Sequence, residues 1–171
     1  MSVARLSGSL LTLEAVGAVI VEERPEPFTL ATAMPKGDRL DWLVQKAAEL
    51  GVDRIVLLHA ERSTVRWKAD RAAKQLVRLR RIADESTRQS RRVWRTEIDG
   101  PVAAHEVLPL AAVAEPGSVG AVGVESMIAI GPEGGWTDDE LARSPRRIGL
   151  GDSVLRVETA AIAATTLRLI R

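Results

Sequence analysis

Apolar residues fall into short runs separated by stretches of mixed character. FTLATAM (28–34), RIVLL (54–58) and SMIAI (126–130) are continuous apolar runs that predict buried strands, and residues 93–98 and 147–150 predict two shorter strands. Strands that read as continuous apolar runs are typical of sheets covered by helices on both faces. The pattern therefore predicts an α/β domain built on a parallel sheet.

Two stretches between these runs repeat their apolar residues every three to four positions, as amphipathic helices do. The first covers residues 38–50, with Asp38 as a favourable N-cap and Gly51 as a favourable C-terminal stop. The second is long and runs from about residue 68 to residue 91. A further short helix is predicted over residues 105–114.

The N-terminal part reads differently from the rest of the chain. Residues 10–23 mix β-branched residues with Gly17 and predict one strand or a hairpin. The proline-rich connector at residues 24–27 is stiff and polar, and it is the best domain boundary in the sequence. A chain of 171 residues can bury one core, so we expect a short β segment over 1–24 and one domain over 25–171.

The composition argues against several classes of protein. Hydrophobic residues make up 46% of the chain and charged residues 27%, with 24 basic and 23 acidic side chains, which is typical of a globular protein. Without cysteine there is no disulfide, thiolate metal site or thiol nucleophile, and only two histidines are present. We therefore expect no metal and a reducing, cytoplasmic location. No apolar run approaches the roughly 20 residues that span a bilayer, so we also expect no membrane partner.

Half of the positive charge lies in one stretch. Residues 61–100 hold twelve Lys and Arg against six Asp and Glu, whereas the rest of the chain holds twelve against seventeen. This stretch, which includes the long predicted helix, is either a solvated helix face or an electrostatic footprint for a polyanion such as nucleic acid. Charge alone does not decide between the two.

Two loops with glycine join predicted strands to predicted helices. In residues 130–136 (IGPEGGW), three glycines permit close backbone approach, and Thr137 and Glu140 then have the spacing of a capping box. In residues 150–155 (LGDSVL), Gly151 permits a sharp exit from the strand and apolar residues offer a wall. Loops at the carboxyl ends of parallel strands bind ligands in open α/β folds, and a plain tight turn is the alternative for the first loop. The sequence motifs of common nucleotide-binding loops are absent.

The last predicted helix, at about residues 158–170, adds two observations. Arg156 and Glu158 bring opposite charges to its start, either as part of a site or as a surface ion pair that contributes at most about 1 kcal/mol. The helix is apolar on most sides, so we expect a second copy of the chain to cover it. The alternative is a central helix covered within its own subunit.

Several segments from residue 27 onward together resemble one family, the RsmE family of SPOUT methyltransferases. Arg88 stands where that family usually has Glu. The segments are, in chain order, KGDR (36–39), VQKAAELGV (44–52), ERS (61–63), RQSRR (88–92), IGPEGGWTDDE (130–140) and LGDSVLRVETAAIAA (150–164).

The resemblance implies a SPOUT-type parallel sheet flanked by helices, a C-terminal trefoil knot, and a remnant of an N-terminal PUA-like β-barrel that binds RNA. It also implies a homodimer that uses S-adenosyl-L-methionine to methylate N3 of a uridine in 16S rRNA of the small ribosomal subunit. The implied cofactor-binding residues are Ile130, Gly131, Pro132, Glu133, Gly134, Gly135, Leu150, Gly151, Val154 and Leu155.

The chain departs from the family at three places. Residues 1–24 resemble only the last strands of the family's barrel, and the stretches 116–126 and 142–146 are short. We expect either a trimmed variant or part of a longer protein, and favour the second because all three differences fall where mobile segments are expected.

The uracil N3–H is weakly acidic, so methyl transfer needs a group that removes the proton or stabilises the anion. Without cysteine, thiol attack on C6 is excluded and direct displacement on the sulfonium methyl group remains. Arg156 is the candidate for stabilising charge on the base. Glu133 or Glu158 is the candidate proton acceptor, and a structural carboxylate that bonds loop amides is the alternative for Glu133.

Basic residues near the motifs are the candidates for RNA binding, because Arg and Lys contact phosphates. Trp94 or Trp136 is a candidate for stacking on a flipped base, with a core or interface role as the alternative. Two other functions stay open: an RNA-binding or ribosome-assembly protein of this fold with weakened catalysis, and a SPOUT methyltransferase of another RNA position. The candidate RNA-binding residues are Lys36, Arg39, Arg88, Gln89, Arg91 and Arg92.

Overall fold

A six-stranded sheet in which every pair of neighbours is parallel forms the centre of the protein, which confirms the predicted α/β class. Its strands are β3 (Thr29–Ala33), β4 (Arg54–His59), β5 (Glu97–Ala103), β6 (Ala112–Ala114), β7 (Met127–Ile130) and β8 (Arg146–Ile148). They lie in the order β5-β4-β3-β7-β6-β8, so β7 separates β3 from β6. The computed structural model describes residues 2–7, 10–14, 17–18, 21 and 23–170.

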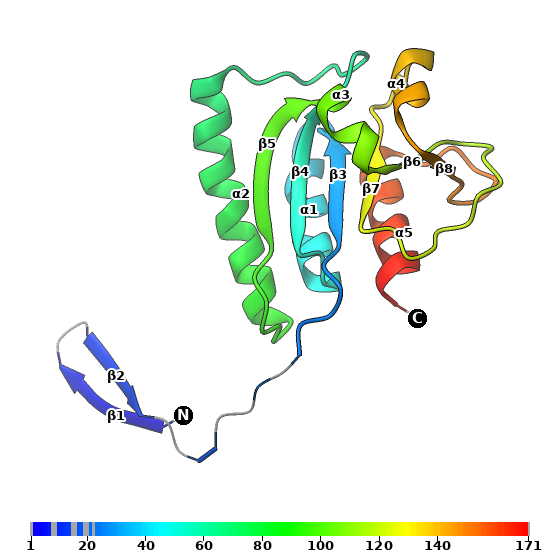
Figure 1. Ribbon diagram of the computed structural model, residues 1–171. Coiled ribbons are helices and arrows are strands. Elements are labelled where there is room, and N and C mark those ends of the chain that lie inside the picture. The colour runs from blue at the N-terminus through cyan, green and yellow to red at the C-terminus, as the bar shows by residue number, and fades with distance from the viewer. Residues whose placement is uncertain (1, 8–9, 15–16, 19–20, 22, 171) are drawn as a thin grey trace.

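Helices cover both faces of this sheet (Figure 1). On one face α1 packs between α2 and α5, and on the other face lie α3, a 3-10 turn η1 and α4. No described helix is both long and apolar enough to cross a membrane. The helices are α1 (Arg39–Leu50), α2 (Ala69–Gln89), α3 (Ala104–Val107), η1 (Leu108–Leu110), α4 (Asp138–Arg143) and α5 (Val157–Leu169).

The sheet has an apolar cluster on each face, which explains the continuous apolar runs of its strands. Leu30 and Ile55 belong to the cluster under α1, α2 and α5, whereas their neighbours Ala31 and Val56 belong to the cluster under α3 and α4. Successive side chains of a strand point to opposite faces, so a strand buried on both faces needs apolar residues throughout.

Two of the three capping features predicted for α1 and α4 are formed. Gly51 ends α1 with φ of 113°, and Thr137 and Glu140 form the predicted capping box, with Glu140 N donating to Thr137 Oγ1 at 3.2 Å and Thr137 N donating to Glu140 Oε2 at 3.0 Å. Asp38 occupies the N-cap position of α1, but its side chain accepts no capping hydrogen bond. Its φ and ψ are already helical, so the carboxylate is not placed over the first N–H groups.

The helix predicted over residues 105–114 is wrong beyond residue 110. Residues 104–110 form α3 and η1, and the next residues form β6, which pairs with β7 on one side and β8 on the other. A strand of three residues is too short to show a period in the sequence. The strand predicted at 93–98 begins later, at Glu97.

The N-terminal segment forms an antiparallel hairpin of β1 (Ser2–Ser7) and β2 (Leu10–Glu14), and this accounts for the first part of the strand or hairpin predicted at 10–23. The remaining positions of that prediction lie largely outside the described residues. Asp53 at the start of β4 anchors the connector, because its Oδ2 accepts from Phe28 N at 2.9 Å and its Oδ1 lies 3.4 Å from Arg24 Nη2. The Arg24 guanidinium also lies 5.4 Å from the centroid of the Trp94 ring.

Candidate active site

A pocket of about 280 Å³ lies where β6, β7 and β8 end, and both predicted loops meet in its wall. Nine of the ten predicted cofactor-binding residues line it, namely all except Gly134. The complete lining is Ala114, Glu115, Pro116, Ile130, Gly131, Pro132, Glu133, Gly135, Trp136, Leu150, Gly151, Ser153, Val154, Leu155, Val157 and Ala160.

The first loop, residues 131–136, is folded over its own tryptophan. Trp136 is 7% exposed, and its Nε1 donates to Ala114 O at 3.3 Å, so the indole belongs to the core beneath the pocket rather than to a free stacking surface. Gly131 lies against this ring, because an added Cβ would be 2.8 Å from Cε2. Gly135 has φ of +73°, a backbone conformation that favours glycine.

Gly134 serves a different contact from the predicted one. An added Cβ there would lie 3.1 Å from Cβ of Arg62, in the turn after β4, and Gly134 itself is not part of the pocket lining. Its lack of a side chain therefore permits close approach of two chain segments.

The third wall of the pocket has no counterpart among the predicted site residues. Ala114 ends β6, Glu115 and Pro116 follow it, and Glu115 N donates to Ile148 O at 3.0 Å at the end of β8. A second backbone hydrogen bond, from Gly149 N to Gly120 O at 2.7 Å, joins the chain after β8 to the 116–126 stretch. The short 116–126 stretch therefore contributes Pro116 to this wall. The signal that could have indicated this wall is the apolar run 111–114, which lies within the helix predicted over 105–114.

Arg39 connects the pocket wall to the last helix. Its Nη1 donates to Glu133 Oε1 at 2.8 Å and lies 3.5 Å from Glu158 Oε1. The hydrogen bond with Glu133 raises the pKa of Arg39, and the negative charge of Glu158 acts in the same direction. Glu158 is 8% exposed, and its Oε2 is buried without a hydrogen-bond partner in the described structure.

Two alternatives considered from the sequence are not formed in the described structure, and one candidate RNA-binding residue, Arg39, is already paired. Glu158 pairs with Arg39, so the ion pair considered between Arg156 and Glu158 is not formed. Glu133 bonds Arg39 instead of loop amides, and Arg39 is held by two carboxylates rather than free for a phosphate. Arg156 is exposed at the start of α5, and within the described residues its side chain makes no hydrogen bond or ion pair.

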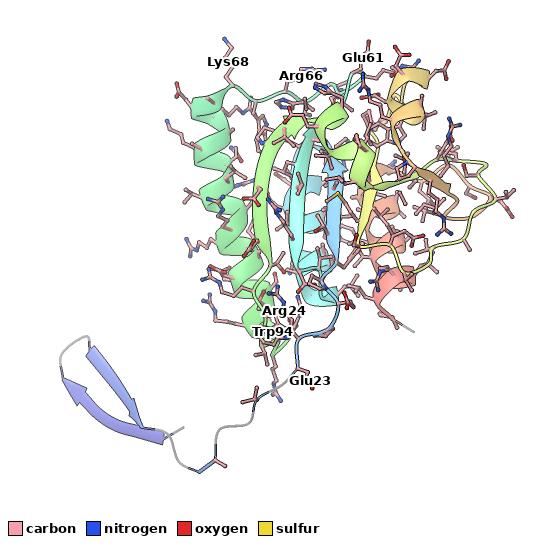
Figure 2. All side chains as sticks on the ribbon, viewed as in Figure 1. Glu23, Arg24, Glu61, Arg66, Lys68 and Trp94 are labelled. Carbon is pink, nitrogen blue, oxygen red and sulfur yellow. The ribbon has the colours of Figure 1, made fainter. Side chains whose placement is uncertain are left out.

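The candidate RNA-binding residues do not form one surface. Lys36 is exposed beside Arg39 at the pocket end of the sheet, whereas Arg88 and Arg91 are exposed where α2 ends, with Gln89. Helix α2 follows β4 and runs back along the sheet, so it ends near the amino ends of the strands. Figure 2 shows Arg66 and Lys68 at the carboxyl end and Trp94 at the opposite end.

Arg92, one of the candidate RNA-binding residues, makes structural contacts within the subunit. Its Nη1 donates to Ala48 O at 3.4 Å, in the last turn of α1, and to Val52 O at 3.3 Å, just after the helix. Burial lowers the pKa of Arg92, and Asp53 at 3.9 Å partly offsets that effect. The residue stabilises the junction of α1 with β4, because it satisfies carbonyls left free at the helix end.

Within the described part of the chain, no three His, Asp or Glu side chains gather so that they could hold a metal ion. The polar groups of the pocket are instead carboxylates, hydroxyls and loop backbone, and its walls are otherwise apolar. Such a lining suits an organic ligand with both apolar and charged parts.

Comparison with known proteins agrees with the geometry. Ribosomal RNA small subunit methyltransferase E of Bacillus subtilis is 30% identical over 169 residues, which cover 83% of this chain and 65% of that protein. A putative methyltransferase of Legionella pneumophila, solved in complex with the cofactor SAM, is 31% identical with a TM-score of 0.78. The match covers 84% of this chain and 66% of the Legionella chain. Ribosomal RNA small subunit methyltransferase E of Neisseria gonorrhoeae, solved bound to S-adenosyl methionine, is 30% identical with a TM-score of 0.74. The match covers 83% of this chain and 65% of the Neisseria chain.

The likeness to these structures confirms the predicted fold, a parallel sheet flanked by helices. This chain spans about two thirds of the length of the Bacillus subtilis protein, 65%. The sequence profile of the RNA methyltransferase domain matches residues 22–168, which is most of the chain. The protein therefore belongs to the RNA methyltransferase domain family.

Proposed function

We propose that this protein transfers a methyl group from S-adenosyl-L-methionine to N3 of a uridine in 16S rRNA. The observation that carries the proposal is the pocket in which the loop after β7 meets the loop after β8. Relatives named ribosomal RNA small subunit methyltransferase E, one of them solved bound to S-adenosyl methionine, support the choice of cofactor and RNA. We infer a cytoplasmic location, because the proposed substrate is ribosomal RNA.

The residues of the pocket fit this cofactor. Val154 is 82% exposed beside the pocket, and with Leu150 and Leu155 it offers an apolar surface for the adenine ring. Gly151 has φ of +122° with no atom within 4 Å of an added Cβ, so the loop leaves room for a ligand against its backbone. Glu115 and Glu133 provide carboxylates for the cationic part of the cofactor.

The cofactor would supply a methyl group on a sulfonium, and the neutral thioether would be the leaving group. The N3–H proton would go to a base, and the N3 electron pair would form the new bond to the methyl carbon as the carbon–sulfur bond breaks. Glu133 lines the pocket and is our candidate acceptor, whereas Glu158 lies outside the lining and its unpartnered Oε2 is buried. The free guanidinium of Arg156 stabilises negative charge on O2 or O4, and Arg39, paired with Glu158, positions Glu133.

The substrate RNA approaches the pocket end of the sheet in this proposal. Lys36 and Arg156 are exposed there and bind phosphate or the base, whereas Arg88 and Arg91 lie at the other end, too far to act with them in one copy of the chain. We assign direct RNA contact to Lys36 and Arg156.

We also infer the two finer features of the fold that the resemblance implies. The insertion of β7 between β3 and β6, with α5 returning past β7, supports a trefoil knot at the C-terminal part. The β1–β2 hairpin supports an N-terminal PUA-like segment over 1–24 and a SPOUT domain over 25–171.

A homodimer is supported by the outer face of α5. The inner face of the helix is buried within its own subunit, but Leu167 near its end is 50% exposed and Ile170, just after it, is 62% exposed, so an apolar patch at its C-terminal end is left for a second copy. Leu167→Glu should convert a dimer to a monomer in light scattering, whereas Val119→Glu, at a fully exposed valine, should leave the mass unchanged. A wild-type monomer that is fully active contradicts this part of the proposal.

Two experiments test the function. Calorimetry measures the binding of S-adenosylmethionine, and mass analysis of the nucleosides detects methylation of unmodified small ribosomal subunits. We expect binding and one N3-methyluridine. Arg156→Ala should lower kcat/KM about 100-fold. Arg143→Ala, at another exposed arginine outside the pocket, should not. No cofactor binding overturns the proposal, binding without methyl transfer favours an assembly protein, and a different methylated nucleoside favours another RNA position.

A further inference from the structure

The turn after β4 reaches the cofactor loop although β3 lies between their strands in the sheet. The turn is closed by two bonds, from Ala60 N to Ser63 Oγ at 3.0 Å and from Ser63 N to Ala60 O at 3.1 Å. Its two outer residues, Glu61 and Arg62, then contact the chain that follows β7. Figure 2 shows Glu61 at this end of the sheet, close to α4.

One guanidinium nitrogen of Arg62 holds two carbonyls of the cofactor loop. Nη1 donates to Gly134 O at 3.2 Å and to Trp136 O at 3.1 Å. These carbonyls flank Gly135, the residue of the loop with a positive φ. Glycine alone does not restrict φ, so a side chain that fixes the carbonyls on both sides restricts the conformation of the loop at its least constrained residue.

Further contacts of the same turn limit the movement of the loop. An added Cβ at Gly134 would meet Cβ of Arg62 at 3.1 Å and its carbonyl oxygen at 3.5 Å, so the two backbones are closely packed. Glu61 N donates to Glu140 Oε1 at 2.9 Å, which fixes the start of α4 directly after the loop. The loop is therefore held at its middle and at its end.

We propose that Arg62 is a positioning residue for the cofactor: it keeps residues 131–136 in the shape that forms the pocket, without lining the pocket itself. This inference rests on the proposed binding of S-adenosylmethionine in that pocket. Both acceptors are backbone carbonyls, and Arg62 makes no ion pair with a carboxylate in the described structure, so the bonds are charge-assisted at one end only.

The expected effect follows from the population of the binding-competent loop. If the loop holds its shape only a tenth of the time without Arg62, the apparent Kd for the cofactor rises about tenfold. The chemistry on a bound cofactor is unaffected, because Arg62 does not touch the pocket. A KM that rises while kcat stays constant is the signature of this role.

The experiment compares Arg62→Met with Arg71→Met. Arg71 is exposed on α2 and has no side-chain partner in the part of the chain described, so it controls for the loss of one positive charge. Calorimetry should give a Kd about tenfold above wild type for the first variant and an unchanged Kd for the second. Arg62→Lys, which keeps a donor, should fall between, and kcat at saturating cofactor should stay within about twofold of wild type.

A double-mutant cycle tests the close packing. Gly134→Ala should weaken cofactor binding in the wild-type background, and should have little further effect after Arg62→Gly, because the clashing Cβ is gone. Wild-type protein that fails to bind S-adenosylmethionine refutes the proposed function. Wild-type binding with equal Kd for Arg62→Met and Arg71→Met refutes the role of Arg62, as does a fall in kcat with an unchanged KM.

Discussion

Gly131→Ala places a methyl group inside the contact distance of Trp136. The added Cβ would lie 2.8 Å from both Cε2 and Nε1 and 3.1 Å from Cδ2, whereas carbon atoms in contact prefer about 3.5–4.0 Å. The overlap is therefore about 0.7 Å. Gly131 does not have a left-handed φ, so the effect is steric rather than conformational.

The indole of Trp136 cannot move away easily. The indole is 7% exposed, packs in the cluster under α3 and α4, and donates to Ala114 O at 3.3 Å. Overpacking of this kind costs about 1–3 kcal/mol of folding free energy. Because Gly131, Trp136 and Ala114 all line the pocket, the same shift should weaken cofactor binding.

Urea denaturation and calorimetry measure the two effects on one protein. Gly37→Ala is the control, because Gly37 has φ of +67° with no atom within 4 Å of an added Cβ, and should show only a backbone penalty of about 1 kcal/mol with unchanged cofactor affinity. In a Trp136→Phe background, the smaller ring should reduce the cost of Gly131→Ala. Equal stability and equal affinity for Gly131→Ala and wild type would refute the reasoning.

Three further predictions concern other parts of the molecule. Asp53→Ala should lower the free energy of unfolding in urea by about 2 kcal/mol, because it removes a charged acceptor from a backbone N–H, and cofactor affinity should not change. Burial lowers the pKa of His59 below 6.5, and the positive charge of Arg66 acts in the same direction, so the unfolded chain binds the proton more readily than the folded one. The free energy of unfolding should therefore fall as pH drops below about 6.5, and His59→Gln should flatten that pH dependence in thermal melts. Lys36→Glu should weaken RNA binding and reduce the salt slope by about one, whereas equal losses for Lys36→Glu and Arg88→Glu would contradict the placement of RNA at the pocket end.

Features that depend on local pattern could be predicted from the sequence. The 3.6-residue period and Gly51 predicted α1, and the capping-box spacing predicted the start of α4. The two loops were predicted because glycines between an apolar run and a helix indicate a sharp turn that permits close backbone approach. In contrast, the contact of Arg39 with Glu158 joins distant parts of the chain, and no local pattern encodes it. The same is true of the contact of Arg62 with the loop carbonyls.

The distance of Arg88 from the pocket follows from the topology of the sheet. Parallel strands joined by a helix require that helix to run back along the sheet, so the C-terminal end of α2 has to lie opposite the loops that follow the strands. The apolar runs predict the parallel sheet, and the chain order places α2 between β4 and β5. Together, these two facts place Arg88 and Arg91 at the end of the sheet away from the pocket, whereas motif proximity in the sequence groups them with Lys36.

The strand order constrains the sequence of events while the protein is being synthesised. β3, β4 and β5 are complete once residue 103 has left the ribosome, but the free edge of β3 pairs only with β7, at residues 127–130. Until then, that edge presents unpaired N–H and C=O groups to other chains. The pocket needs residues up to Ala160, so a nascent chain cannot gain stability from the cofactor until residue 160 has been made and has folded onto the sheet.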